Sequence, residues 1–138
     1  MPAKNIYHDA VVHALAADGW TITHDPLILS YGGRDLFVDL GADAPLGAER
    51  EGRKIAVEIK SFVSPSDMHD LEVALGQYAL YRTLLGRTEA DRVLYLAVPN
   101  RVYLSLFSEP LGQLVIQEQR LHLLVFDDEK AKVEKWIP

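Results

Sequence analysis

Residues Arg53–Phe62 read R-K-I-A-V-E-I-K-S-F, and this stretch carries the strongest β-strand pattern in the chain. Side chains alternate between the two faces of a strand with a period of two residues. The aliphatic residues that share one face, and that we expect to enter the core, are Ile55, Val57 and Ile59. Glu58 and Lys60 share the other face. The pattern thus predicts an acid and a base on one side of a strand whose opposite side is buried.

Upstream of this strand, the sequence predicts a helix followed by two strands. Apolar residues recur with helical spacing over Asn5–Asp18, and Gly19 ends the pattern. A short strand is expected at Trp20–His24 and a second at Leu36–Leu40, with a turn at Tyr31–Gly33 between them. The polar stretch Ala42–Gly52 is expected to form an exposed loop.

Downstream, Ser64-Pro65-Ser66-Asp67 is typical of a helix start, and a long helix is expected from there to about Leu85, ending at Gly86. Arg92–Val98 has the composition of a buried strand, and Pro99 favours the start of another short helix. Terminal strands are predicted at Leu121–Phe126 and Val133–Ile137. The fold class expected is mixed α/β, in the order α-β-β-β-α-β with a C-terminal extension of helix and strands.

Length and composition limit the functions to consider. The chain has 138 residues, which suits a single domain spanning 1–138, and its hydrophobic content of 49% suits a packed core. Its net charge of -6 argues against indiscriminate coating of nucleic acid or membrane. It has no cysteine, which excludes disulfides and thiolate metal sites. No apolar run approaches the roughly 18 residues that cross a bilayer, so we expect a cytoplasmic protein without membrane contact.

Two carboxylates are expected to meet at the centre of the fold. In the strand Leu36–Leu40, Asp39 points away from the apolar face formed by Leu36, Val38 and Leu40. If this strand pairs antiparallel with Arg53–Phe62, Asp39 and Glu58 lie side by side. Facing carboxylates are destabilising unless a cation lies between them. Mg²⁺ or Mn²⁺ would be held by Asp39 and Glu58, because hard cations prefer carboxylate oxygens.

Lys60 and the long helix extend this candidate site. An ammonium two residues after Glu58 can stabilise negative charge near an attacked phosphate, which suits metal-assisted phosphodiester hydrolysis. Gln77 and Tyr81 lie four residues apart, on one face of the helix, where both could line the same cleft. The alternatives are that Glu58 and Lys60 form a solvated surface pair, that Gln77 is an exposed helix residue, and that Tyr81 belongs to the edge of the core.

This arrangement resembles the PD-(D/E)XK restriction-endonuclease-like core and its Gln-X-X-X-Tyr helix motif. The matching residues are Asp39, Glu58-Ile59-Lys60 and Gln77 through Tyr81. Val38 stands where that superfamily has proline. The resemblance implies a mixed β-sheet flanked by helices, with catalytic roles for Asp39, Glu58, Lys60, Gln77 and Tyr81. It also draws attention to His8, near where related nucleases carry an acidic metal-site residue; surface or helix packing is the alternative role for this histidine.

The whole chain further resembles the XisH family of fdxN-element excision controlling factors. The segments that carry this resemblance are Ile6–His8, Gly19–Pro26, Arg34–Leu36, Val38–Gly41, Ala56–Phe62, Leu75–Tyr78, Asp91–Leu96 and Lys135–Pro138. Membership implies a DNA-acting factor that works with a site-specific recombinase and with a small XisI-type companion protein.

Three functions remain open at this point. The first is metal-dependent cleavage of DNA in support of excision. The second is a non-catalytic interaction module that partners the XisI-type protein and the recombinase, which the negative net charge favours. The third is a toxin-like nuclease restrained by its companion. The apolar C-terminal strands could also pair with another chain, including a second copy in a homo-oligomer.

Overall fold

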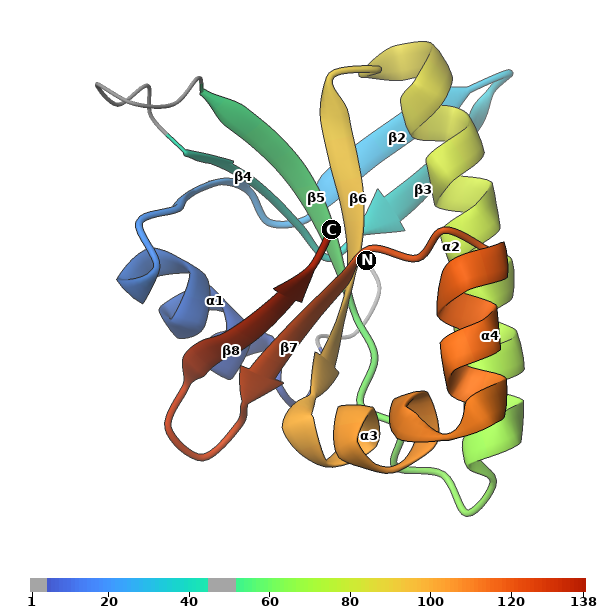
Figure 1. The fold of residues 1–138 in the computed structure, drawn as a ribbon. Coiled ribbons are helices and arrows are strands. Elements are labelled where there is room, and N and C mark those ends of the chain that lie inside the picture. The colour runs from blue at the N-terminus through green and yellow to red at the C-terminus, as the bar shows by residue number, and fades with distance from the viewer. Residues whose placement is uncertain (1–4, 45–51) are drawn as a thin grey trace.

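The computed structural model describes residues 5–44 and 52–138 (Figure 1). Its elements, in chain order, are α1 (His8–Ala17), β1 (Thr21–His24), β2 (Leu27–Tyr31), β3 (Arg34–Val38), β4 (Leu40–Ala44), β5 (Arg53–Ile59), α2 (Asp67–Thr88), β6 (Arg92–Pro99), α3 (Asn100–Leu104), the 3₁₀ turn η1 (Leu106–Ser108), α4 (Pro110–Glu118), β7 (Leu123–Asp127) and β8 (Lys132–Ile137).

A six-stranded mixed sheet forms the centre of the fold, in the order β1-β4-β5-β6-β7-β8. β5, β6 and β7 run parallel to one another, while the remaining neighbours pair antiparallel. α1 lies on one side of the sheet, and α2 and α4 lie on the other (Figure 1). This arrangement confirms the predicted mixed α/β class with helices flanking a central sheet.

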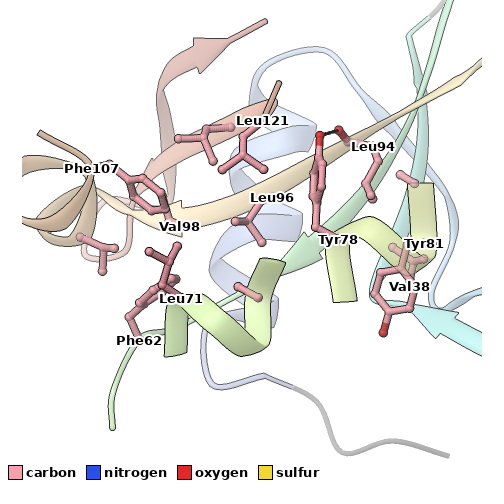
Figure 2. Close-up of a cluster of buried hydrophobic side chains, with 14 of the residues drawn as sticks. Val38, Phe62, Leu71, Tyr78, Tyr81, Leu94, Leu96, Val98, Phe107 and Leu121 are labelled. Atoms are coloured by element: carbon pink, nitrogen blue, oxygen red, sulfur yellow. Dashed lines mark hydrogen bonds between the residues drawn. The ribbon is translucent and has the colours of Figure 1, made fainter. Parts of the chain in front are cut away.

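The central strand β5 is buried on both faces, as is usual for strands in the parallel part of a sheet. Ile55, Val57 and Ile59 pack with Val11 and Leu15 of α1, which confirms the predicted core face. The opposite face packs under α2: Ala56 and Leu96 belong to a second cluster that also holds Tyr78, shown in part in Figure 2. The side of β5 that carries Glu58 is therefore covered rather than solvated.

The prediction of a single strand over Leu36–Leu40 is wrong. The chain breaks at Asp39: β3 ends at Val38 and pairs with β2 in a separate hairpin, whereas β4 begins at Leu40 and joins the main sheet. Val38 consequently packs in the α2 cluster and Leu40 in the α1 cluster, so the two do not share one apolar face. The hairpin turn at Tyr31–Gly33 is as predicted.

The number of strands before the long helix is also corrected, from three to five. The hairpin adds β2, an apolar run that follows Pro26 and packs on α2. The first residues of the expected loop, Ala42–Ala44, belong to β4 because they pair with β5. Residues 45–51 of that loop lie outside the described residues, and Gly52 precedes β5 as an exposed loop residue.

α1, α2 and α3 agree with the predictions apart from their ends, whereas the sequence analysis predicts one short helix after β6 and the structure has α3, η1 and α4 there. α2 is capped by the side chain of Ser66, which accepts a hydrogen bond from the His69 amide, and it continues past Gly86 to Thr88. α3 begins after Pro99 as expected. Among the residues that the structure describes, none of the helices combines the length and hydropathy needed to cross a bilayer.

Candidate active site

Asp39 and Glu58 lie side by side at the point where the hairpin joins the main sheet. The register pairs Leu40 of β4 with Val57 of β5, so the acid before Leu40 faces the acid after Val57. Each carboxylate accepts a hydrogen bond from the other strand: the Ile59 amide donates to Asp39 Oδ2 at 2.8 Å, and the Asp39 amide donates to Glu58 Oε1 at 3.2 Å. These two bonds hold both acids at the break in the strand.

Lys60 completes a group of two acids and one base. It lies one residue beyond β5, not within the strand as predicted, but its amide still donates to the Ala97 carbonyl of β6 at 2.9 Å. Its Nζ lies 3.5 Å from Glu58 Oε2, and its side chain is 20% exposed. The ammonium therefore lies at the solvent-facing rim of the group.

The pKa of Glu58 is strongly shifted by its surroundings. Its side chain is 8% exposed. Burial and then the neighbouring Asp39 carboxylate raise the pKa of Glu58 from 4.5 to about 8, and the Lys60 ammonium offsets part of this increase. In the protein alone, Glu58 therefore keeps its proton at neutral pH. A carboxyl group with such a shifted pKa beside a second acid is typical of a functional site.

Tyr81 lies close to the two acids from the α2 side. It is buried, and in Figure 2 it lies with Val38 at one end of the hydrophobic cluster. Burial and then the negative charges of Glu58 and Asp39 raise the pKa of Tyr81 to about 12. Its hydroxyl group therefore stays protonated and can act as a hydrogen-bond donor.

Gln77 lies one helical turn before Tyr81. Its Oε1 atom is buried and has no hydrogen-bond partner among the described residues. A buried amide oxygen without a partner is costly, so it is usually explained by a donor or a cation that belongs at that position. Gln77 therefore has an unused hydrogen-bond acceptor one helical turn before Tyr81. Tyr81 itself is a core residue that carries a hydroxyl group.

The residues present fit a magnesium site. Mg²⁺ is commonly held by one or two carboxylates, with waters and substrate phosphate as its other ligands. Asp39 and Glu58 would supply the carboxylates. Among residues 5–44 and 52–138, no group of three or more histidine, aspartate or glutamate side chains gathers into a larger metal site.

The ring of His8 contacts carboxylates outside the candidate site. It is buried on α1, with Nε2 2.8 Å from Asp25 Oδ1 and Nδ1 3.3 Å from Asp9 Oδ1. Both ring nitrogens therefore face carboxylates other than those of Asp39 and Glu58. This geometry favours a packing role for His8 in the protein alone.

Sequence patterns did not identify the contacts that fix the position of Lys60. On one side, Asn5 donates to the Ile59 carbonyl at 3.2 Å. On the other side, Arg101 donates to the carbonyls of Ser61 and Phe62. Phe62 has a φ of 52°, in the left-handed region that non-glycine residues rarely adopt. These contacts join residues far apart in the chain, and no local motif signals them.

Comparison with known proteins places the chain in a family. The sequence profile of the family described as "XisH protein" matches residues 1–134. The crystal structure of an XisH family protein from Nostoc punctiforme PCC 73102 is similar, with 40% identity, a TM-score of 0.86, and coverage of 97% of this chain and 100% of its own. No curated protein matches the chain.

A second crystal structure, of an fdxN element excision controlling factor protein from Anabaena variabilis, is 41% identical. Its TM-score is 0.87, and the match covers 98% of this chain and 100% of that one. A profile match over nearly the full length and two solved structures at this identity agree with one another. The chain belongs to the XisH family.

Proposed function

We propose that this XisH family chain is a DNA-acting factor that controls site-specific excision of a DNA element, and that it cleaves phosphodiesters with Mg²⁺ or Mn²⁺ on a PD-(D/E)XK-type core. Support for excision control comes from the Anabaena variabilis relative, whose name describes an fdxN element excision controlling factor. Support for cleavage comes from the site, where an acid before β4, an acid at the end of β5 and a lysine two residues later gather at one junction.

The observation that carries the catalytic proposal is the pairing of the buried Glu58 with the half-buried Asp39. Glu58 is 8% exposed and faces Asp39, and burial and then the Asp39 carboxylate raise its pKa to about 8. The pair is unfavourable in its ionised form unless a cation shares it. A divalent ion bound there would lower the pKa of a bound water and so supply a nucleophile near neutral pH.

The protein's own side chains would then act on the substrate. The ammonium of Lys60, at the rim, would bind a phosphate oxygen and stabilise the charge that develops on it. The neutral hydroxyl of Tyr81 would donate a further hydrogen bond, since its raised pKa keeps the proton in place. The amide of Gln77 would orient a water or a phosphate oxygen from the neighbouring helical turn.

A cleavage assay with a matched control tests this function. Purified protein is incubated with Mg²⁺ or Mn²⁺ and with plasmid, branched or single-stranded DNA. We expect cleavage that is lost in Lys60→Ala and retained in Lys54→Ala, because Lys54 lies on the same strand but pairs with Asp91 at 3.4 Å, away from the acids. Absence of cleavage on every substrate, or equal cleavage by Lys60→Ala, would contradict a catalytic role.

A second candidate function is a non-catalytic module that partners an XisI-type protein and a recombinase. The net charge of -6 favours it, because a protein that handles DNA alone usually presents a more basic surface. Under this alternative, a tagged chain retains the XisI-type companion in a pull-down, and Glu58→Ala supports excision as well as the wild type does. Loss of excision in Glu58→Ala, with the companion still bound, would favour the catalytic function.

A further inference from the structure

A pocket opens directly beside the candidate active site. It lies between the segment that follows β5 and the first turns of α2, and its volume is about 230 Å³. Lys60, which pairs with Glu58 at the rim of the site, also lines this pocket. A ligand whose phosphate meets the Lys60 ammonium would therefore have this pocket as its immediate neighbour.

The same edge of α2 serves both the pocket and the site. Asp70 and Val73 line the pocket, and Gln77 and Tyr81 follow at intervals of four residues. Residues three and four apart share one side of a helix. The edge that borders the two acids at Tyr81 thus continues, two to three turns earlier, into the wall of the pocket.

The pocket has a mixed polar and apolar lining, and two of its apolar residues are exposed. Val63 is 63% exposed and Val73 is 43% exposed, and each contributes from a different segment. Aliphatic side chains on either side of a hollow gain free energy when a flat apolar surface covers them. A planar ring suits this arrangement.

The polar groups of the pocket suit the edge of a base better than a second phosphate. Asp70 accepts a hydrogen bond from the Ser64 amide at 3.2 Å, and a carboxylate has lone pairs for further donors. A second phosphate would be repelled by Asp70, whereas an exocyclic amine would be bound. The Ser61 hydroxyl group adds a donor and an acceptor at the same pocket.

We propose that this pocket binds the unpaired base, one bearing an exocyclic amine, of the nucleotide next to the phosphate at Lys60. The chain would then act on single-stranded or locally opened DNA, in which a base can leave the stack. The net charge of -6 agrees with this, since binding one nucleotide neutralises far fewer phosphates than binding a duplex does. The inference rests on the proposed function, because it takes Lys60 as the phosphate-binding residue.

Binding of a mononucleotide, measured by NMR on the full chain without metal, tests the pocket separately from catalysis. Deoxycytidine 5′-monophosphate is titrated in buffer containing a chelator. We expect the amide signals of Ser61, Val63 and Ser64 to shift, and we expect inorganic phosphate not to shift Val63. The variant Val73→Trp, which fills the pocket, should weaken binding by about tenfold, a typical value for the loss of one stacked base.

Leu80→Trp is the matched control. Leu80 is 49% exposed on the same helix but does not line the pocket, so this variant should bind the nucleotide as the wild type does. Unshifted amides, equal shifts with inorganic phosphate, or normal binding by Val73→Trp would each overturn the pocket assignment. Nucleotide binding that persists in a protein without DNA cleavage would instead contradict only the catalytic proposal.

Discussion

Two clusters of ionisable side chains lie at opposite ends of the same strands, and each contains two acids and one base with one buried group at its centre. At the start of β6, the guanidinium group of Arg92 occupies the centre. It is 3% exposed and lies 3.3 Å from Asp43 and 3.2 Å from Glu89, whose side chains are 38% and 31% exposed. It also donates to the Ile55 carbonyl at 3.0 Å. The buried ion in this cluster has an opposite charge on each side.

The second cluster inverts this arrangement. Here an acid, Glu58, occupies the buried centre, a second acid, Asp39, faces it, and Lys60 lies at the rim with its Nζ 3.5 Å from Glu58. Two acids and one base therefore favour folding around Arg92, whereas around Glu58 they oppose it when Glu58 is ionised. Geometry, and not the number of charges, distinguishes the ion-pair network around Arg92 from the group around Glu58 that we propose binds a cation.

The largest expected effect is the loss of the central cation in the stabilising cluster. Arg92→Met removes one donor from the Ile55 carbonyl and leaves the two acids without their shared partner. Breaking a buried ion pair in this way typically costs about 3–5 kcal/mol of unfolding free energy. Urea denaturation measures the loss, with Lys54→Ala as an exposed-pair control that should change stability by less than about 1 kcal/mol. A loss for Arg92→Met no larger than that of the control would contradict a stabilising role.

The second prediction concerns the buried acid, in metal-free buffer. The folded protein holds the Glu58 proton up to about pH 8, whereas the unfolded chain releases it near 4.5, so the native state binds more protons between these values. Stability should therefore fall as pH rises from about 4.5 to 8, by roughly 2–4 kcal/mol. Glu58→Gln should remove most of this fall and be the more stable protein at pH 9. Parallel curves of unfolding free energy against pH for the two proteins would contradict the raised pKa of Glu58.

The smallest effect on stability is expected at the rim. Lys60→Met removes a partly exposed ammonium, so the unfolding free energy at pH 7 should change by less than about 1 kcal/mol. DNA cleavage should nevertheless be lost, because the ammonium is the proposed phosphate contact. A loss of stability comparable to that of Arg92→Met would mean that Lys60, like Arg92, serves mainly the fold.

The core face of β5 and the fold class can be predicted from the sequence, because strand alternation is a local property. The period-two pattern of Arg53–Phe62 correctly predicts the core face of β5. The antiparallel pairing that the sequence analysis assumed is present between β4 and β5, and it brings Asp39 beside Glu58. The α/β class follows from the spacing of helix and strand patterns. These features depend on residues that are close together in the chain.

The features that could not be predicted depend on contacts between distant segments. Val38 and Leu40 have the alternation of one continuous strand, and only the packing of the hairpin against α2 separates them onto different clusters. Two further features are visible only in the folded chain. One is the Gln77 oxygen, which has no partner among the described residues, and the other is the hydrogen bond that Arg101 donates to the segment after Lys60. Sequence patterns named the candidate residues but gave no indication of the burial and hydrogen bonds that surround Glu58 in the fold.

The most direct test of the account is calorimetric titration with Mn²⁺ at pH 7, on the wild type and on Asp39→Asn and Glu58→Gln. We expect the wild type to bind the ion and to release a proton as it does so, because Glu58 is protonated beforehand and must ionise to bind the metal. Repeating the titration in buffers of different ionisation enthalpy measures that proton. Both variants should lose the binding. Equal binding by all three proteins, or no binding by the wild type, would contradict the assignment of Asp39 and Glu58 as a metal site.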